Sequence, residues 1–236
     1  MNQPKVLVII PAYNEEGSIA NVIRRIQAVA ADTGLHIDTV VVNDGSKDAT
    51  VRVARAAGAT AVIDLPFNLG IGGAMQTGYL YAHKNQYDIA LQIDADGQHN
   101  PHDIPTVIEP ILRGESHFVV GSRYVEKTAY RSSAMRRIGM IFFSSLIRLV
   151  TKHTVKDPTS GFRAADRRVI RMFAEYYPVD YPEVEVLVHI ARRGLTFQEV
   201  SVEMSERQAG TSSITPIKSA YYMIKVGLAV LISATR

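Results

Sequence analysis

Short runs of apolar, often β-branched residues recur through the first half of the sequence, and segments with helical periodicity separate them. The first run, Val6 to Ile10, contains no polar residue, which is typical of a strand buried on both faces of a sheet, and Pro11 is predicted to end it. Further strands are predicted at 39–42, 61–63, 89–93 and 118–120, with helices after a cap at Asn14 and at 51–57, 70–83 and 103–113. This alternation predicts βαβ units, and hence an α/β fold with a mostly parallel sheet flanked by helices.

The second half is less regular. A basic amphipathic helix is predicted from Met135 to Thr151, and a loop from Asp157 to Arg163. A helix from Glu183 to Arg192, a strand from Thr196 to Val202, a polar loop at 206–213 and a final helix after Pro216 complete the prediction. We find no repeat and no linker, so the prediction is one domain spanning residues 1–236.

Composition excludes several classes of protein. The chain has no cysteine, so it has neither a disulfide framework nor a Cys-ligated zinc site, which fits a reducing compartment. Its net charge of +3 is compatible with anionic substrates or an anionic membrane surface, and no nucleic-acid-binding motif accompanies it. We predict no signal peptide and no transmembrane span, because the longest mostly apolar stretch, Ser219 to Ala234, is interrupted by Lys225.

Polar clusters follow three of the predicted strands. They are Pro11 to Glu15, Asn43 to Ser46, and Asp94 to Gln98. In open parallel sheets, ligands bind beyond the carboxyl ends of the strands. The three clusters therefore predict one shared site at that edge of the sheet.

Asp94 and Asp96 are the strongest candidates for metal ligands. Strand alternation puts them on the same side, about 6 to 7 Å apart along the backbone. Two carboxylates at that spacing repel one another unless a cation such as Mg²⁺ or Mn²⁺ lies between them. Gln98 offers a neutral oxygen, and His99 is a weaker candidate. A solvated acidic turn explains the same pattern, so the motif is weak by itself.

The other clusters also allow two interpretations each. Asp44 either accepts hydrogen bonds from a nucleobase or ribose, or forms an Asx-turn that caps the next helix. Tyr13 either lies against a nucleobase or belongs to an ordinary helix start. The Gly-rich segment 68–74 either holds an anion at a helix N-terminus or packs a helix closely on the sheet. It lacks the Lys and Ser/Thr of a P-loop.

Taken together and in order, these segments resemble the family 2 glycosyltransferases. The resemblance is strongest to the dolichol-phosphate-mannose-synthase-like and dolichol-phosphate-glucose-synthase-like branch, whose members make polyprenyl-phosphate sugars. It covers roughly Val6 to Ser213. The segments that carry it are PAYNE at 11–15, VNDGSKDAT at 42–50, NLGIGGAMQTGY at 68–79, DADGQH at 94–99, GSR at 121–123 and DPTSGFR at 157–163.

The resemblance implies a GT-A-type, Rossmann-like fold and direct displacement at the anomeric carbon with inversion. Residues 1–125 would form the nucleotide-sugar-binding half, 126–213 the acceptor-side half, and 214–236 a C-terminal amphipathic helix. The predicted donor-binding residues are Pro11, Tyr13, Glu15, Asp44, Gly72, Asp94 and Ala95. Asp94, Asp96 and Gln98 would hold Mg²⁺ or Mn²⁺. Asp96, Asp157 and Arg123 are the predicted catalytic residues, and the acceptor or diphosphate would meet Arg123, Arg136, Arg137, Ser160, Arg163 and Arg207.

The acceptor decides what Asp157 would do. A polyprenyl phosphate is already anionic near neutral pH and needs no general base, whereas a sugar hydroxyl needs one. Asp157 is therefore a candidate base, or it orients Arg163 or caps a turn. The sequence departs from the family pattern at Ile71 and Met140, where many relatives have Lys and Ser, and in the loop Gly210 to Ser213. These departures leave the donor and the acceptor open.

We expect transfer of a hexose or N-acetylhexosamine from a UDP- or GDP-sugar to a polyprenyl phosphate, with the chain peripheral on the cytoplasmic face of the membrane. The two basic amphipathic helices would lie in the bilayer interface, or would pack on the core, on an integral membrane partner or in a homo-oligomer. The alternative acceptor is a sugar hydroxyl of a growing glycan. A nucleotidyltransferase would need a Gly-rich loop with Arg and Lys where this chain has PAYNEE, and an inactive sugar-nucleotide-binding module would not need Asp94, Asp96 and Arg123.

Overall fold

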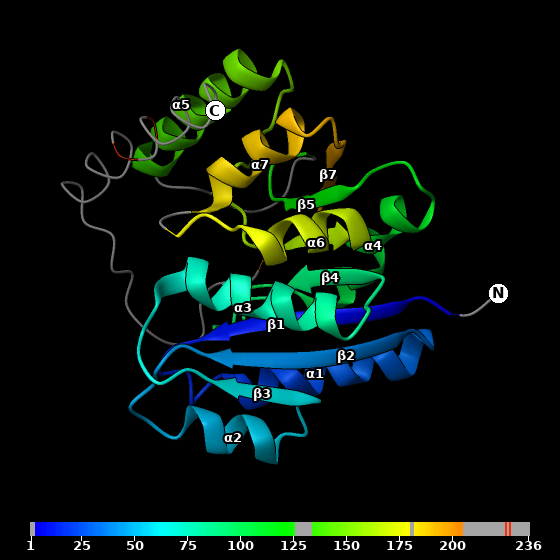
Figure 1. Ribbon diagram of the computed structural model, residues 1–236, viewed down its shortest axis with the longest axis vertical. Coiled ribbons are helices and arrows are strands. Elements are labelled where there is room, and N and C mark those ends of the chain that lie inside the picture. The colour runs from blue at the N-terminus through cyan, green and yellow to red at the C-terminus, as the bar shows by residue number, and fades with distance from the viewer. Residues whose placement is uncertain (1–2, 126–133, 180–181, 205–224, 226, 228–236) are drawn as a thin grey trace.

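The computed structural model describes residues 3–125, 134–179, 182–204, 225 and 227. In this part of the chain, seven strands form one sheet in the order β3-β2-β1-β4-β6-β5-β7 (Figure 1). The strands are β1 Lys5–Ala12, β2 His36–Asn43, β3 Ala61–Asp64, β4 Ile89–Gln92, β5 Phe118–Ser122, β6 Arg163–Asp166 and β7 Phe197–Ser201.

The sheet is mostly parallel, as the sequence predicts. β1, β2, β3 and β4 run parallel to one another, and β5 and β7 form a second parallel pair. β6 joins the two groups and runs antiparallel to both β4 and β5. The described helices are α1 Ile19–Thr33, α2 Thr50–Ala56, α3 Gly70–Lys84, α4 Ile104–Leu112 after the short 3₁₀ turn Pro101–Asp103, α5 Ala134–Thr151, α6 Arg167–Glu175 and α7 Pro182–Arg192.

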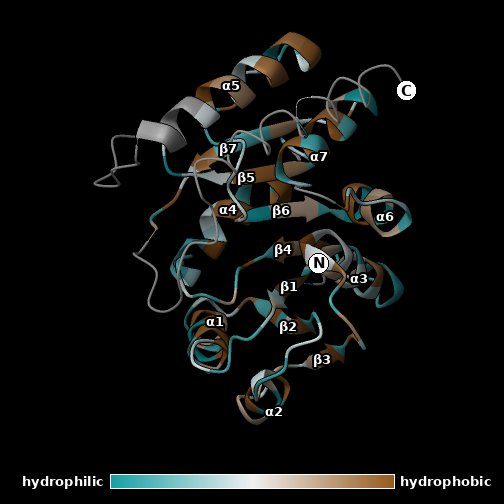
Figure 2. Cartoon of the chain, turned by 90° about the vertical axis from the view of Figure 1, so that its left-hand side faces the viewer, coloured by the Kyte–Doolittle hydropathy of each residue, from teal (hydrophilic) through white to brown (hydrophobic). Residues whose placement is uncertain are grey.

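Helices cover both faces of the sheet, which is why β1 is apolar from Val6 onward. Leu7 and Ile9 join a core cluster with α3, α5, α6 and α7. Val6, Val8 and Ile10 point the other way, into a cluster with α1, α2 and α4. Figure 2 shows α3, α6 and α7 on one side of the sheet and α1 and α4 on the other. The apolar side chains of β1 are thereby removed from water, and its backbone is hydrogen-bonded to β2 on one edge and to β4 on the other.

Two predictions at the end of the first strand are wrong. Pro11 does not end the strand, because Pro11 and Ala12 still pair with Val42 and Asn43 of β2. Asn14 does not cap a helix either, since α1 begins at Ile19 after Ser18. Asn14 instead adopts a positive φ of 56°, and its Oδ1 accepts a hydrogen bond from the Lys47 backbone N–H at 2.9 Å. It therefore joins the loop after β1 to the loop after β2.

β6 and α6 were not predicted from the sequence. β6 reads Arg-Ala-Ala-Asp, without a β-branched residue, so its strand character comes from pairing on both sides. Asp166 then caps α6, since its Oδ1 accepts from the backbone N–H groups of Arg168 and Val169, each at 2.9 Å. The predicted loop from Asp157 to Arg163 thus leads directly into a strand and then a helix, β6 and α6.

The predicted amphipathic helix at 135–151 is confirmed as α5. Ile141, Phe142 and Leu149 on this helix are exposed, while Phe143 and Ile147 are buried in the core. The loop at 206–213 and nearly all of the final helix lie outside the described residues, so those predictions stay open. Among the helices that the structure describes, none combines the length and the apolar character needed to span a bilayer.

Candidate active site

A cleft of about 360 Å³ opens at the carboxyl ends of β1, β2 and β4. The three polar clusters that the sequence places at this edge meet there, as expected for parallel strands. Seven predicted site residues line the cleft, namely Pro11, Tyr13, Glu15, Asp44, Asp94, Ala95 and Asp96. The wall also contains residues from segments that the sequence singles out, namely Ala12, Asn68, Gly70, Ile71, Ala74, Thr159 and Gly161. Gln92 and Glu183 complete it, and neither is predicted from the sequence.

Hydrogen bonds between the first two loops hold the donor-side rim. The Asn14 backbone N–H donates to Ser46 Oγ at 2.8 Å, and the Glu15 N–H donates to Thr50 Oγ1 at 2.8 Å. In return, the Ala49 N–H donates to the Glu16 carboxylate at 2.8 Å. Backbone groups that β1 leaves unpaired at its end are thereby satisfied, and the loop carrying Tyr13 and Glu15 is fixed to the loop carrying Asp44.

Asp44 caps a helix, but a different one from the helix expected. Its two carboxylate oxygens accept from the Leu69 N–H at 2.7 Å and the Gly70 N–H at 2.9 Å, at the start of α3. Gly45, at φ 71°, lets the loop approach, because a Cβ there would lie 2.8 Å from the Asn68 nitrogen. Asp44 is buried and still lines the cleft, so capping and nucleoside binding are compatible.

Asp94 is held by its neighbours on and after β4. Its Oδ1 accepts from Gln92 Nε2 at 3.0 Å, and its backbone N–H donates to His99 Nδ1 at 3.1 Å. His99 is buried and stacks on Phe162 with ring centroids 5.1 Å apart. Because Nδ1 acts as an acceptor, a neutral His99 carries its proton on Nε2, which lies 3.9 Å from the other Asp94 oxygen. His99 therefore contacts both the backbone and the carboxylate of Asp94 and orients this residue.

Asp96 is buried, and its Oδ1 accepts from the Gln98 backbone N–H at 3.1 Å. Gln98 itself is not among the residues that line the cleft, so its contact with the predicted metal site runs through this N–H. Asp94 and Asp96 both face the cleft, on either side of Ala95. The two predicted metal ligands therefore lie at the same cleft.

The two carboxylates fit a hard divalent cation that completes its shell with substrate oxygens. Within the part of the chain that the structure describes, no group of three His, Cys, Asp or Glu side chains gathers to hold a metal. One or two carboxylates together with substrate phosphates are the usual site for Mg²⁺. Gly161 leaves room for this, since a Cβ there would lie 2.9 Å from Asp94 Oδ2.

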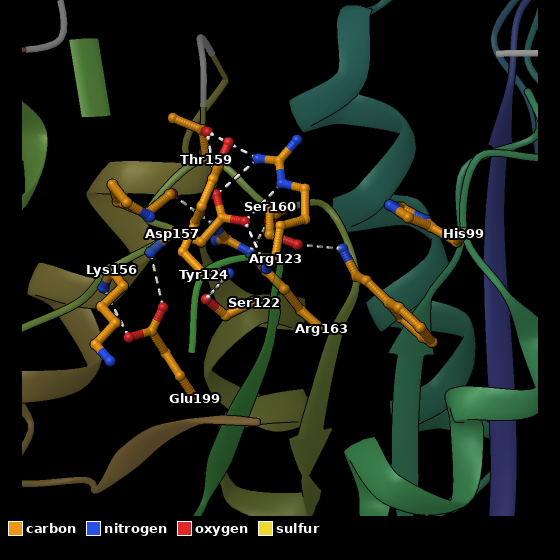
Figure 3. A network of polar contacts seen from close by, with 12 residues as sticks. His99, Ser122, Arg123, Tyr124, Lys156, Asp157, Thr159, Ser160, Arg163 and Glu199 are labelled. Carbon is orange, nitrogen blue, oxygen red and sulfur yellow. Dashed lines mark hydrogen bonds and ion pairs between the residues drawn. The ribbon is translucent and has the colours of Figure 1, made fainter. Parts of the chain in front are cut away.

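Arg123 and Asp157 form a buried bidentate ion pair (Figure 3). Arg123 Nε donates to Asp157 Oδ2 and Nη2 donates to Oδ1, both at 2.7 Å, and the Arg123 backbone N–H adds a bond of 3.1 Å to Oδ2. Asp157 has no exposed surface. Both of its oxygens thus hold Arg123, a role that is not among those predicted from the sequence. Arg123 Nη2 also lies 3.4 Å from Thr159 Oγ1, and Thr159 lines the cleft.

Arg163 is a structural brace in this fold. Its guanidinium donates to the carbonyl oxygens of Ser160, Pro158 (2.8 Å) and Glu183 (2.7 Å), and the side chain is buried. It joins the loop before β6 to the first turn of α7, so it pairs with carbonyl groups and not with Asp157. Ser160 is also buried, and its Oγ accepts from the Phe162 N–H at 3.3 Å.

The remaining predicted residues lie elsewhere. Gly72 is buried against the backbone of Pro178 and Val179, where a Cβ would meet both carbonyl oxygens at 2.3 Å, and it is not part of the cleft wall. Arg136 and Arg137 belong to α5, but their side chains are outside the described residues. Arg207 is outside them altogether.

Glu183 is the missed residue with the most chemical interest. It lies in the first turn of α7 and lines the cleft. Burial raises the pKa of its carboxyl group, the Arg163 guanidinium opposes that shift, and the nearby Asp94 carboxylate adds to it. No local motif marks Glu183, because it reaches the cleft through the packing of α7, far along the sequence from Asp94.

The mostly parallel sheet, with Asp94 and Asp96 lining a cleft beyond β4, matches the GT-A class of fold. One similar solved structure is glucosyl-3-phosphoglycerate synthase from Mycobacterium tuberculosis in complex with Mn²⁺ and UDP-glucose. It shares 25% identity and a TM-score of 0.71 over 98% of this chain and 79% of that chain.

The chain belongs to glycosyl transferase family 2, whose model matches residues 7–173. It is 30% identical to a UDP-N-acetylglucosamine–dolichyl-phosphate N-acetylglucosaminyltransferase from Methanococcus voltae, over 94% of this chain and 96% of that protein. It is 26% identical to the polyprenol monophosphomannose synthase of Mycolicibacterium smegmatis, over 94% and 85% of the two chains. The family predicted from the sequence motifs is therefore confirmed, and the chain is a glycosyltransferase.

Proposed function

We propose that this glycosyltransferase moves a hexose or N-acetylhexosamine from a UDP- or GDP-sugar to a polyprenyl phosphate, with inversion at the anomeric carbon. The observation that carries the proposal is the pairing of Asp94 and Asp96 in one cleft with Asp44 and Tyr13. The acceptor class is supported by the relatives from Methanococcus voltae and Mycolicibacterium smegmatis, whose names include dolichyl phosphate and polyprenol.

On the donor side, Asp44 and Tyr13 would bind the nucleoside at the ends of β2 and β1. Tyr13 is 46% exposed at the cleft, so its ring is accessible for stacking against a base. Asp94 and Asp96 would hold Mg²⁺ or Mn²⁺, which supplies positive charge to the diphosphate leaving group when bound. The similar Mn²⁺ and UDP-glucose complex supports this choice of cofactor and donor class.

On the acceptor side, Arg123 and Thr159 would serve the transferring groups. An anionic phosphate oxygen attacks without a general base, so this side needs positive charge and positioning more than proton transfer. Arg123 is not part of the cleft wall, so it would act on the acceptor side through Thr159, while Asp157 fixes its guanidinium. Arg136 and Arg137 of α5, and Arg207, remain predicted contacts for the acceptor phosphate.

Glu183 favours a second candidate acceptor, a sugar hydroxyl. A hydroxyl nucleophile must lose its proton during the transfer, and Glu183 places a carboxyl group on the cleft wall where it could accept that proton. Asp157 is less suited to the role of base, because Arg123 occupies both of its oxygens. In this alternative, replacing Glu183 by Gln would abolish transfer.

We place the enzyme at the cytoplasmic membrane surface, where a polyprenyl phosphate is accessible. α5 exposes Ile141, Phe142 and Leu149, and its sequence also contains Arg136, Arg137 and Arg148. Exposed apolar residues beside basic residues are typical of helices that lie in the interface of an anionic bilayer.

A transfer assay separates the two acceptors. The purified chain is incubated with UDP- and GDP-sugars, Mn²⁺ and detergent-dispersed undecaprenyl or dolichyl phosphate, and products are identified by mass spectrometry. We expect a polyprenyl-phosphate sugar from one donor, and no product from the matched polyprenol that lacks the phosphate. Transfer to soluble glycans but not to the lipid phosphate would reject the proposal.

A further inference from the structure

Glu199 on β7 holds the loop that carries Asp157. Its two carboxylate oxygens accept from the backbone N–H groups of Lys156 and Asp157, each at 2.7 Å (Figure 3). A carboxylate that accepts hydrogen bonds from two successive N–H groups fixes the orientation of the backbone there, because both bonds are charge-assisted and therefore strong. The position of residues 156–157 is therefore set from the edge strand of the sheet.

This contact continues to the cleft through the residues already described. Glu199 holds the Asp157 backbone, the Asp157 side chain holds the Arg123 guanidinium at 2.7 Å, and Arg123 reaches Thr159 on the cleft wall. Asp157 and Arg123 are buried, so neither side chain has free space in which to find another geometry. A displacement of residues 156–157 would therefore move the guanidinium.

Backbone hydrogen bonds attach β7 to the sheet, and the Glu199 side chain takes no part in them. β7 pairs in parallel with β5 over five positions, from Phe118 with Phe197 to Ser122 with Ser201. The Val202 N–H adds a backbone bond to the Ser122 carbonyl at 3.1 Å. The Glu199 carboxylate instead points to residues outside the strand pairing, which suits positioning better than strand assembly.

We propose that Glu199 is a positioning residue for the transfer reaction and acts through Asp157 on Arg123. The inference rests on the proposed function in one respect: Arg123 must serve the acceptor side of the cleft. It adds a residue on the edge strand β7 to those that serve the reaction. We call the series of contacts from Glu199 through Asp157 to Arg123 the relay, and the inference gives Asp157 its role there.

The test compares Glu199→Gln with Asp166→Ala. Glutamine keeps the shape of the side chain but offers an N–H₂ group to one of the two N–H donors, so one of the two bonds is lost. Asp166 is a matched control because one of its carboxylate oxygens also accepts two backbone N–H groups, at the opposite end of β6 from the cleft. Its loss lowers stability without touching the relay.

Hydrogen–deuterium exchange is measured first because it needs no acceptor. In Glu199→Gln we expect faster exchange at residues 156–157 and also at 122–124, since the Arg123 N–H donates to Asp157. In Asp166→Ala we expect faster exchange near 166–169 only. Unchanged exchange at 122–124 in Glu199→Gln would overturn the inference, even if no lipid acceptor is ever found.

Kinetics then test the functional consequence. We expect Glu199→Gln to lower kcat/KM for the polyprenyl phosphate by roughly tenfold, with the Kd for the nucleoside diphosphate changed less than about twofold. In an Arg123→Ala background, Glu199→Gln should change kcat/KM by less than about twofold, because its route to the cleft is gone. Equal losses in both backgrounds would show an effect that bypasses Arg123 and would refute the relay. A wild-type chain inactive on the lipid phosphate would instead reject the proposed function.

Discussion

Gly161 faces Asp94 across the wall of the cleft. The chain has a glycine here because a Cβ would lie 2.9 Å from Asp94 Oδ2 and 3.2 Å from Gln92 Nε2. Gln92 and His99 already fix Asp94 from the other directions. An added methyl group therefore has to displace the carboxylate itself. Gly161 protects the metal site although it contributes no ligand.

We predict that Gly161→Ala lowers transfer activity at least tenfold while the free energy of unfolding falls by less than about 1 kcal/mol, because the displaced group is the end of a side chain. Gly139→Ala is the matched control, since a Cβ there meets nothing within 4 Å inside α5. That control should keep its activity. Activity assays and urea unfolding of both variants check the prediction, and a fully active Gly161→Ala would contradict it.

The sequence predicts the location of residues that directly follow a parallel strand. Asp44, Asp94 and Asp96 follow strands, and the carboxyl ends of parallel strands share one edge. Arg163 and Gly72 stand inside motifs, which is why the sequence alone predicts them in the site. Their actual partners, the carbonyl groups of Pro158 and Glu183 and the backbone of Pro178 and Val179, are set by tertiary packing that no local pattern reveals.

At the scale of elements, the first turn of α3 packs closely against the chain segment that precedes α7. The backbone of Pro178 and Val179 passes directly over Gly72, in the first turn of the helix. Asp44 fixes that turn from the other side through the N–H groups of Leu69 and Gly70. Within the Gly-rich segment, Gly72 therefore allows close packing, whereas Gly70 lines the cleft.

We predict that Gly72→Ala destabilises the protein by about 2 to 3 kcal/mol or prevents folding, because the methyl group would meet backbone atoms that cannot rotate away. Chemical denaturation measures the loss. If folded Gly72→Ala is obtained, its affinity for nucleoside diphosphate should stay close to that of the wild type. A stable variant with lost nucleotide binding would restore Gly72 to the donor site.

Asp103 links the turn before α4 to the segment after β7, since its carboxylate accepts from the Glu203 N–H at 2.9 Å. Burial raises the pKa of Asp103, the Glu203 N–H and His102 oppose the shift, and the Glu203 carboxylate adds to it. A raised folded-state pKa means that this contribution to stability is complete at low pH and is lost as pH rises through that pKa.

We predict that Asp103→Asn, which keeps an acceptor oxygen but does not ionise, gains stability relative to wild type as pH rises from below the ordinary aspartate pKa to above the raised one. The gain should stay under about 1 kcal/mol because the carboxyl is only partly buried. Urea unfolding of both proteins across that range gives the difference. A relative loss for the variant with rising pH would reverse the sign and refute the assignment.

The elements themselves were predictable to different degrees. Strands such as β1 and β2 can be found in the sequence because each contains an apolar run, 6–10 and 40–42, that is buried on both faces of the sheet. β6 could not be found in this way, because it is four residues long and contains two alanines. Its antiparallel direction follows from its place between β4 and β5, which is a property of the sheet and not of the segment.

At the scale of the whole molecule, α5 exposes an apolar surface beyond the sheet. The exposed fractions are 65% for Ile141 and 76% for Leu149, high for side chains of this size. We predict that the chain co-sediments with anionic lipid vesicles and that Ile141→Glu with Leu149→Glu lowers the bound fraction by roughly tenfold. Leu112→Glu, at a 47% exposed site on α4, is the control and should bind as wild type. Equal binding by all three proteins would reject a membrane role for α5.

The central claim is that Asp94 and Asp96 bind the donor diphosphate through a divalent cation. Isothermal titration of UDP and GDP into the apo protein, with Mn²⁺ or with EDTA, tests it most directly. We predict binding of one nucleotide that weakens at least tenfold in EDTA and equally in Asp96→Asn, because the charge that links protein to diphosphate is lost in both cases. Undiminished affinity in EDTA and in Asp96→Asn would contradict the account.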